Sequence, residues 1–217
     1  GCNLSCLNCQ NASISQASPS EVPGRELSPE DVARLAVQTG SPLVAYTYTE
    51  PLTYLEYVCD CARACREAGV KNVLVTAGYV NPRPLADLLP HLDAANVDLK
   101  SFSDEVYRAV SHARLSPVLA TLEQLRDAGV WVEVTNLVIP GLNDSEPMIR
   151  AMCTWLAGHG FADSPLHFSC FFPHHRMQDV PPTPVGTLLR ARVTARDCGL
   201  RHVYIGNVDL PGAEDTC

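Results

Sequence analysis

Six short apolar runs, rich in Val, Ile and Leu, alternate along the chain with longer segments whose apolar residues recur at helical spacing. The short runs predict strands at residues 43–48, 72–76, 96–100, 130–139, 166–171 and 202–207. The longer segments predict helices at residues 29–39, 54–68, 84–94, 117–128, 145–157 and 185–198. Because strands and helices alternate with no long polar linker between them, the pattern predicts an α/β fold with a parallel sheet and crossover helices.

Capping residues mark the ends of several predicted helices. Ser28 is a favourable N-cap for the segment 29–39, and Gly40 follows its last residue. Gly69, Gly129 and Gly199 stand at the ends of three later helices, and an apolar residue follows each of them directly. Such short connections from helix to strand are typical of compact α/β units.

Polar residues gather where the predicted strands end: Glu50, Thr76, Asp98, Lys100 and Asn136. The chain contains neither G-x-G-x-x-G nor a G-x-x-x-x-G-K-[ST] loop, the usual nucleotide fingerprints of open doubly wound sheets. In a (β/α) barrel, ligand-binding residues gather at the carboxyl ends of the strands. The pattern therefore favours a partial (β/α) barrel over an open sheet.

The composition is that of an ordinary folded protein, with 46% hydrophobic and 18% charged residues in a chain of 217. This length suits a single domain spanning residues 1–217. The formal net charge of −8 argues against a general nucleic-acid or anionic-membrane binder, because both need clustered Lys and Arg. No apolar run approaches about 18 residues and no signal-peptide pattern is present, so we expect no membrane contact and a cytoplasmic location.

Three of the ten cysteines, Cys2, Cys6 and Cys9, fall within the first nine residues. In a reducing compartment, clustered thiols more often bind metal or do redox work than form disulfides. Three thiolates spaced C-x3-C-x2-C would hold an iron–sulfur cubane and leave one iron open. Zinc would need a fourth ligand, and the next twenty residues contain neither Cys nor His. Zinc or another metal, and thiols merely packed in a turn, are the alternatives. Cys61 and Cys65, one helical turn apart, are expected to be buried core residues.

Seven segments carry a resemblance to a known family. The cysteine loop 2–11 and the segment 46–51, Tyr-Thr-Tyr-Thr-Glu-Pro, resemble the radical S-adenosylmethionine (SAM) enzyme of the AmmeMemoRadiSam system, a close relative of pyruvate formate-lyase activating enzyme. The resemblance runs from residue 2 to about residue 208 and implies the partial barrel of radical SAM enzymes. The other matching segments, in family order, are 75–80, 97–102, 137–144, 165–169 and 203–208.

The resemblance implies a [4Fe–4S] cluster on Cys2, Cys6 and Cys9, with SAM bound at the open iron. Reduction by an electron donor such as flavodoxin or ferredoxin would cleave SAM to a 5′-deoxyadenosyl radical, which abstracts hydrogen from a protein or small-molecule substrate. A glycyl-radical-enzyme activase, whose substrate is a glycine on a partner protein, is one alternative. A non-catalytic iron–sulfur or zinc protein that has lost SAM chemistry is an alternative of another class.

The resemblance also implies roles for residues at the strand ends. Glu50 lies in a Thr-Glu-Pro that stands where relatives carry Gly-Gly-Glu-Pro, and it would support the methionine amino group of SAM. Asp98 would bind the ribose hydroxyls, Lys100 the SAM carboxylate, and Leu137 the adenine. Two plain alternatives stand beside these roles: an ordinary ion pair between Asp98 and Lys100, and Glu50 as a cap of the following helix. The implied cofactor-binding set is Thr49, Glu50, Thr76, Asp98, Lys100 and Leu137.

Three departures from the family pattern concern the adenine and substrate side. Asn8 stands where relatives carry an aromatic residue, and Ala77 replaces a common Asn. Residues 169–173 read Ser-Cys-Phe-Phe-Pro, where relatives tend to read Ser-Arg-Phe-His-Pro. His174 and His175, which follow, are expected in a solvated loop.

The ends of the chain bear on the domain boundaries. The sequence opens on the cysteine cluster, so we expect the strand that carries this loop to precede residue 1. Cys217 is the last residue, where similar proteins begin a short Cys-x2-Cys segment, so we expect the carboxyl end to be cut as well.

Overall fold

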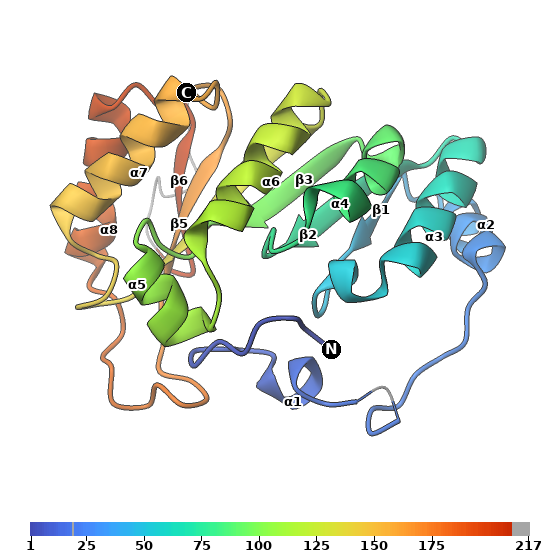
Figure 1. Ribbon diagram of the computed structural model, residues 1–217, viewed down its shortest axis with the longest axis horizontal. Coiled ribbons are helices and arrows are strands. Elements are labelled where there is room, and N and C mark those ends of the chain that lie inside the picture. The colour runs from blue at the N-terminus through green and yellow to red at the C-terminus, as the bar shows by residue number, and fades with distance from the viewer. Residues whose placement is uncertain (19, 210–217) are drawn as a thin grey trace.

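The computed structural model describes residues 1–18 and 20–209. These residues form one sheet of six parallel strands, which lie side by side in chain order (Figure 1). This arrangement confirms the predicted α/β fold with a parallel sheet, and it is consistent with a partial barrel. The strands are β1 (Leu43–Tyr46), β2 (Lys71–Thr76), β3 (Ala94–Asp98), β4 (Trp131–Val138), β5 (Leu166–Cys170) and β6 (Val203–Gly206).

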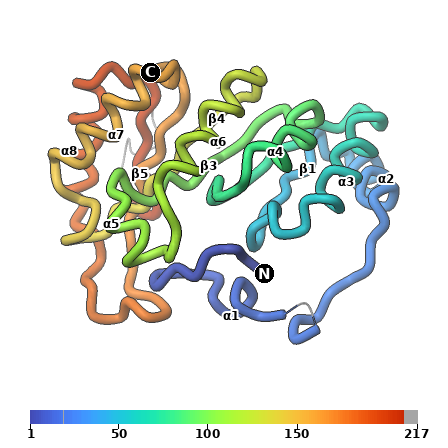
Figure 2. Tube along the Cα trace, viewed as in Figure 1, coloured from blue at the N-terminus to red at the C-terminus, as the bar shows by residue number. Residues whose placement is uncertain are grey.

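Helices connect the strands and cover one face of the sheet (Figure 1). Figure 2 shows that the amino-terminal segment, in blue, instead runs past the ends at which the strands finish. The α-helices are α1 (Ala12–Ser15), α2 (Pro29–Thr39), α3 (Leu55–Glu67), α4 (Pro82–Leu88), α5 (Asp104–Val106), α6 (Leu115–Asp127), α7 (Glu146–Gly158) and α8 (Val185–Asp197). Three short turns complete the set: the 3-10 turns η1 (Pro51–Tyr54) and η2 (Leu89–His91), and the π-helical turn η3 (Tyr107–Ser111).

Side chains along the strands alternate between an outer face under the helices and an inner face. On the outer face Leu74, Val97, Val134, Phe168 and Ile205 are at most 1% exposed. The interior of an eight-stranded barrel is packed with branched apolar residues. The inner face here instead carries partly exposed polar residues, and it is therefore available to a ligand. These are Asn96, Asp98, Glu133, Thr135, His167 and Ser169.

The structure corrects three predicted boundaries. The helix predicted at 84–94 is wrong beyond residue 88, where α4 gives way to η2 and then to β3. Pro90 lies in this stretch and lacks the N–H that an α-helix would need. β3 ends two residues before its predicted end at residue 100. β1 ends at Tyr46 and not at residue 48, because Tyr48 has a φ of 37°, outside the strand region.

α1, α5 and η3 were not predicted, because three to five residues are too few to show a period. Cys217, on which the expectation at the carboxyl end rests, lies outside the described residues. Within residues 1–18 and 20–209, no helix is both long and apolar enough to cross a bilayer.

Gly78 follows β2 where the chain passes close to the sheet and to α6. Its φ is +66°, and a Cβ there would lie 2.9 Å from Val97 Cγ1 and 3.4 Å from Val118 Cγ1. Gly78→Ala should therefore lower the free energy of unfolding by about 2–4 kcal/mol, since left-handed strain and overpacking add. Gly129→Ala, at φ +74° with open space around it, should cost only about 1 kcal/mol. Urea unfolding measures both losses, and equal losses would show that packing does not constrain Gly78.

Candidate functional site

The nine residues assigned to the cluster and to SAM line one cavity of about 340 Å³ at the carboxyl ends of the strands, whereas Asn136, also expected there, does not. They come from the amino-terminal loop, from the segments after β1 and β3, and from β2, β3 and β4. Residues far apart in the sequence therefore meet because parallel strands finish at the same edge of the sheet. The nine are Cys2, Cys6, Cys9, Thr49, Glu50, Thr76, Asp98, Lys100 and Leu137.

Each of the three cysteines is partly exposed toward this cavity. The Leu4 amide donates a hydrogen bond to Cys2 Sγ at 3.4 Å, and the Ser15 hydroxyl lies 3.3 Å from Cys9 Sγ. Burial raises the pKa of the Cys2 thiol, and the Leu4 N–H opposes that rise. Hydrogen bonds to sulfur are a normal feature of protein iron–sulfur sites.

The three thiols can be compared with the ligands that a zinc ion and an iron–sulfur cluster need. Among residues 1–18 and 20–209, no group of three or more His, Cys, Asp or Glu side chains is arranged to hold one metal ion. A cubane binds each thiolate through a different iron, so its thiolates stand farther apart than the ligands of one zinc ion. Three thiolates are the donors that a cubane with one open iron needs, whereas a structural zinc site takes four ligands, so the chemistry of the donor set suits a cluster.

The cysteine loop is held from one side by the π-helical turn η3. The Leu7 amide donates to the Val110 carbonyl at 2.8 Å, and the Ser5 amide donates to the Ser111 carbonyl at 3.4 Å. Just beyond the turn, His112 Nδ1 lies 2.7 Å from Ser5 Oγ and 3.0 Å from the Ser5 carbonyl. These contacts place the loop against the segment that follows β3.

The same turn also holds the backbone of Lys100. Tyr107 is 1% exposed, and its hydroxyl accepts a hydrogen bond from the Lys100 amide at 2.9 Å. Burial raises the pKa of Tyr107 above its ordinary value, so the phenol stays neutral. Because the Lys100 amide bonds to this hydroxyl, it does not continue the ladder of β3. Asn143 Nδ2 donates to the Lys100 carbonyl at 2.7 Å and fixes the other side of the residue.

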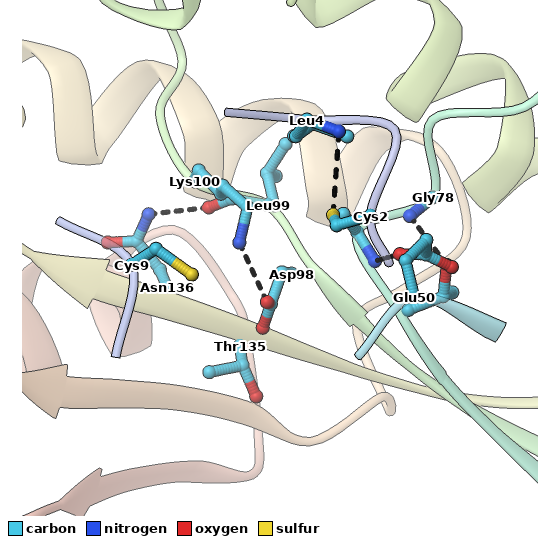
Figure 3. A network of polar contacts seen from close by, with 12 residues as sticks. Cys2, Leu4, Cys9, Glu50, Gly78, Asp98, Leu99, Lys100, Thr135 and Asn136 are labelled. Carbon is cyan, nitrogen blue, oxygen red and sulfur yellow. Dashed lines mark hydrogen bonds and ion pairs between the residues drawn. The ribbon is translucent and has the colours of Figure 1, made fainter. Parts of the chain in front are cut away.

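Asp98 and Lys100 form an ion pair, with 2.8 Å between Asp98 Oδ2 and Lys100 Nζ (Figure 3). Both side chains line the cavity and remain partly accessible, at 41% and 26%. Burial alone would lower the pKa of Lys100, but the Asp98 carboxylate raises it, so the ammonium stays charged. The ordinary ion pair between Asp98 and Lys100, which was the alternative to a cofactor site, is thus present. Both of its side chains line the cavity, so a ligand bound there could replace either partner.

Glu50 is 2% exposed and accepts three hydrogen bonds. Oε1 accepts from Thr76 Oγ1 at 2.6 Å and from the Leu52 amide at 3.2 Å, while Oε2 accepts from the Ala77 amide at 2.8 Å. Burial raises the pKa of Glu50, and these hydrogen bonds oppose that rise. Glu50 therefore joins η1 to the end of β2 and caps η1, as the alternative predicted. A carboxylate has about four acceptor positions, so one remains for a ligand.

Thr49 follows β1 and Leu137 lies on β4, and both line the cavity. Thr49 Oγ1 donates to the Gly1 carbonyl and so ties the segment after β1 to the cysteine loop. Leu137 is half-buried near the end of β4 and packs with the cluster that contains Ile139 and Phe171.

The departures from the family pattern have clear positions. Asn8 and Ala77 both line the cavity. Cys170 is 2% exposed and its Sγ lies 3.4 Å from the Thr183 carbonyl, outside the cavity lining. His174 and His175 lie in the loop after β5 and do not line the cavity, as expected.

For some further residues the sequence predicted the position in the fold correctly, and for others it gave no prediction. Cys61 and Cys65 are fully buried in the core, as predicted. Tyr107 and His112 were missed, because a lone Tyr or His carries no signal of the contact it makes. Thr135 and Ser169, which also line the cavity, were detectable in principle as polar residues inside apolar strands.

The comparisons with known proteins agree on one family. The sequence profile of the Radical SAM superfamily matches residues 1–152. An uncharacterised protein of Methanocaldococcus jannaschii is 44% identical over 99% of this chain and 63% of its own length. The pyruvate formate-lyase-activating enzyme of Clostridium pasteurianum is 25% identical over 70% of this chain and 64% of its own length. The benzylsuccinate synthase activating enzyme of Thauera aromatica is 30% identical over 56% of this chain and 38% of its own length. The chain thus spans less than two thirds of each of these relatives.

Two solved structures share the fold. Streptococcus suis SuiB bound to S-adenosylmethionine matches 98% of this chain and 49% of its own, with a TM-score of 0.75 at 13% identity. A domain of pyruvate-formate lyase-activating enzyme from Bacteroides vulgatus matches 76% of this chain and 98% of its own, with a TM-score of 0.64 at 19% identity. At these identities the likeness shows the fold alone.

Tyr107→Phe tests whether η3 couples the cysteine loop to Lys100. The change leaves the buried Lys100 amide without its acceptor, so the free energy of unfolding should fall by about 1–3 kcal/mol. Amide hydrogen exchange of residues 5–9 and 99–101 should become faster together. Tyr57→Phe removes the hydroxyl that bonds to the Leu27 carbonyl on an exposed side chain, and should change neither quantity noticeably. Unchanged exchange in the Tyr107 variant would mean that the turn does not couple the two segments.

Proposed function

This chain belongs to the radical SAM superfamily, and on that premise we propose that it is an enzyme carrying a [4Fe–4S] cluster on Cys2, Cys6 and Cys9. Members of the superfamily are enzymes that bind such a cluster together with SAM. The observation that carries the proposal is that nine residues chosen from the sequence line one cavity. An unrelated pocket would not combine three thiols with the carboxylates and the ammonium that SAM requires.

The chain's own residues bind and orient the cofactor. Lys100 takes the SAM carboxylate, and Asp98 accepts hydrogen bonds from the ribose hydroxyls, so SAM replaces the ion pair between them. The remaining acceptor position of Glu50 takes the methionine ammonium, and Leu137 packs on the adenine. Thr49 and Thr76 fix the two segments that flank Glu50. When bound there and given an electron by a donor such as flavodoxin or ferredoxin, the cluster and SAM would supply the 5′-deoxyadenosyl radical chemistry that abstracts hydrogen from the substrate.

The substrate is a protein or a small molecule. Two of the relatives are named as activating enzymes, of pyruvate formate-lyase and of benzylsuccinate synthase, which supports glycyl-radical-enzyme activation as the second candidate. An iron–sulfur protein without SAM chemistry is the contrasting class. Detection of 5′-deoxyadenosine from reduced, reconstituted protein separates the enzymes from that class.

The cluster assignment predicts the iron content. Anaerobically reconstituted protein should hold about four irons per chain and release 5′-deoxyadenosine when SAM and dithionite are added. Replacing Cys2, Cys6 or Cys9 by Ala should abolish both, since a cubane held by three thiolates does not survive the loss of one. Cys59→Ala, at a partly exposed thiol on α3 outside the cavity, should leave both intact. Full zinc occupancy without iron-dependent absorbance would contradict the assignment.

The SAM site predicts a separate loss of affinity. Lys100→Ala should weaken SAM binding by about 1.5–3 kcal/mol, the range for a hydrogen bond to a charged group, while the iron content stays the same. Asp98→Ala should weaken it as well. Lys71→Ala, at an exposed lysine that begins β2, is the matched control and should bind SAM normally. If neither cavity variant changes the affinity, Asp98 and Lys100 form only a structural ion pair.

A further inference from the structure

The inner face of the sheet stays polar below the cavity that the nine residues line. Thr135 on β4 and Ser169 on β5 belong to the cavity. Two residues earlier on the same strands stand Glu133 and His167, which therefore face the same side. Two residues along a strand correspond to about 6.6 Å, so Glu133 lies that far below Thr135 on β4. His167 is the residue of β5 that is aligned with Thr135.

Glu133 and His167 are paired across β4 and β5. The distance from His167 Nε2 to Glu133 Oε2 is 2.9 Å, and the two side chains are 31% and 37% exposed. The His167 ring stacks on Tyr204 of β6, with centroids 5.1 Å apart and an interplanar angle of 18°. On the other side of Glu133, Thr135 Oγ1 donates to Asn96 Oδ1 at 2.9 Å. Side chains from four neighbouring strands thus form one continuous polar surface.

A purely structural role accounts poorly for this pair. The main-chain ladder already joins β4 to β5 over five aligned residue pairs. An ion pair that is about one third exposed adds only about 0–1 kcal/mol. The helices cover only the outer face of the sheet (Figure 1), so the pair stands on a face that is open to a ligand.

The charges on this surface indicate the kind of group it takes. Asp98 and Lys100 balance each other at the level of the cavity. Glu133 adds a carboxylate below them, and the neighbouring Asn96 and Thr135 are neutral. The stacked His167 and Tyr204 rings add aromatic surface beside that carboxylate, and such surface also attracts cations.

We propose that the Glu133–His167 pair anchors the substrate by a positively charged amine or guanidinium group. The group pairs with the Glu133 carboxylate, whose orientation His167 fixes. The rest of the substrate then extends along the inner face into the cavity, about 6.6 Å higher. That the bound molecule is the substrate of a reaction rests on the proposed function. That the site binds a cation does not.

Agmatine, which carries a guanidinium and an amine, is the probe, and valerate is the anion of comparable length. Their binding to reconstituted, SAM-loaded protein is measured by isothermal titration. Agmatine should bind with a Kd below about 10 mM, and valerate about tenfold more weakly or not at all. Glu133→Gln should weaken agmatine binding about tenfold or more, because it removes the charge and keeps the shape. His167→Gln should weaken it less.

The chain offers a matched control on its outer surface. Glu123 and His159 form a similar pair, 3.9 Å apart and 41% and 40% exposed, between α6 and the end of α7. Glu123→Gln should change the agmatine Kd by less than about twofold, since this pair lies on the helix side of the sheet. Equal losses in the two Glu variants, equal binding of valerate, or no agmatine binding would each overturn the proposal. Formation of 5′-deoxyadenosine is measured in the same preparations. Its absence with cation binding intact would count against the proposed function and leave the anchoring site standing.

Discussion

Backbone hydrogen bonding between six parallel strands is the constraint on which the rest of this structure depends. Parallel pairing brings the carboxyl ends of all the strands to one edge, where their following loops can share a ligand. It also sets the alternation that sends apolar side chains outward to the helices and polar ones inward. The cavity, its ion pair and the deeper Glu133–His167 pair all follow from this arrangement.

A second layer of contacts adapts this general scaffold to the cysteine loop. The turn η3 holds the loop by two backbone hydrogen bonds and holds the Lys100 amide by the Tyr107 hydroxyl. Glu50 performs the matching task on the other side, between η1 and the end of β2. The thiols, the ammonium and the carboxylates are therefore positioned by one connected set of hydrogen bonds. Such mutual positioning is needed wherever small displacements are costly to a reaction.

The sequence predicted the sheet, and which residues line the cavity, far better than it predicted the contacts that support them. Apolar runs broken by C-cap glycines such as Gly129 located every strand, and polar residues at the strand ends, such as Asp98, located the cavity. The prediction failed where a local feature overrode the pattern, as at Pro90, where apolar spacing continued but the α-helix did not. It also failed for Tyr107 and His112, because their roles depend on a contact across the fold and on a turn of five residues. The inward position of Glu133 and His167 follows from strand alternation, but their pairing required the register of β4 and β5.

We propose that one cavity joins a reducible cluster to SAM. Electron paramagnetic resonance of the dithionite-reduced, reconstituted protein, recorded before and after SAM is added, tests it most directly. We expect the signal of a [4Fe–4S]⁺ cluster whose g values shift when SAM is added, because SAM would bind at the iron that no cysteine holds. A cluster signal that SAM leaves unchanged, or a reduced protein without any cluster signal, would contradict the account.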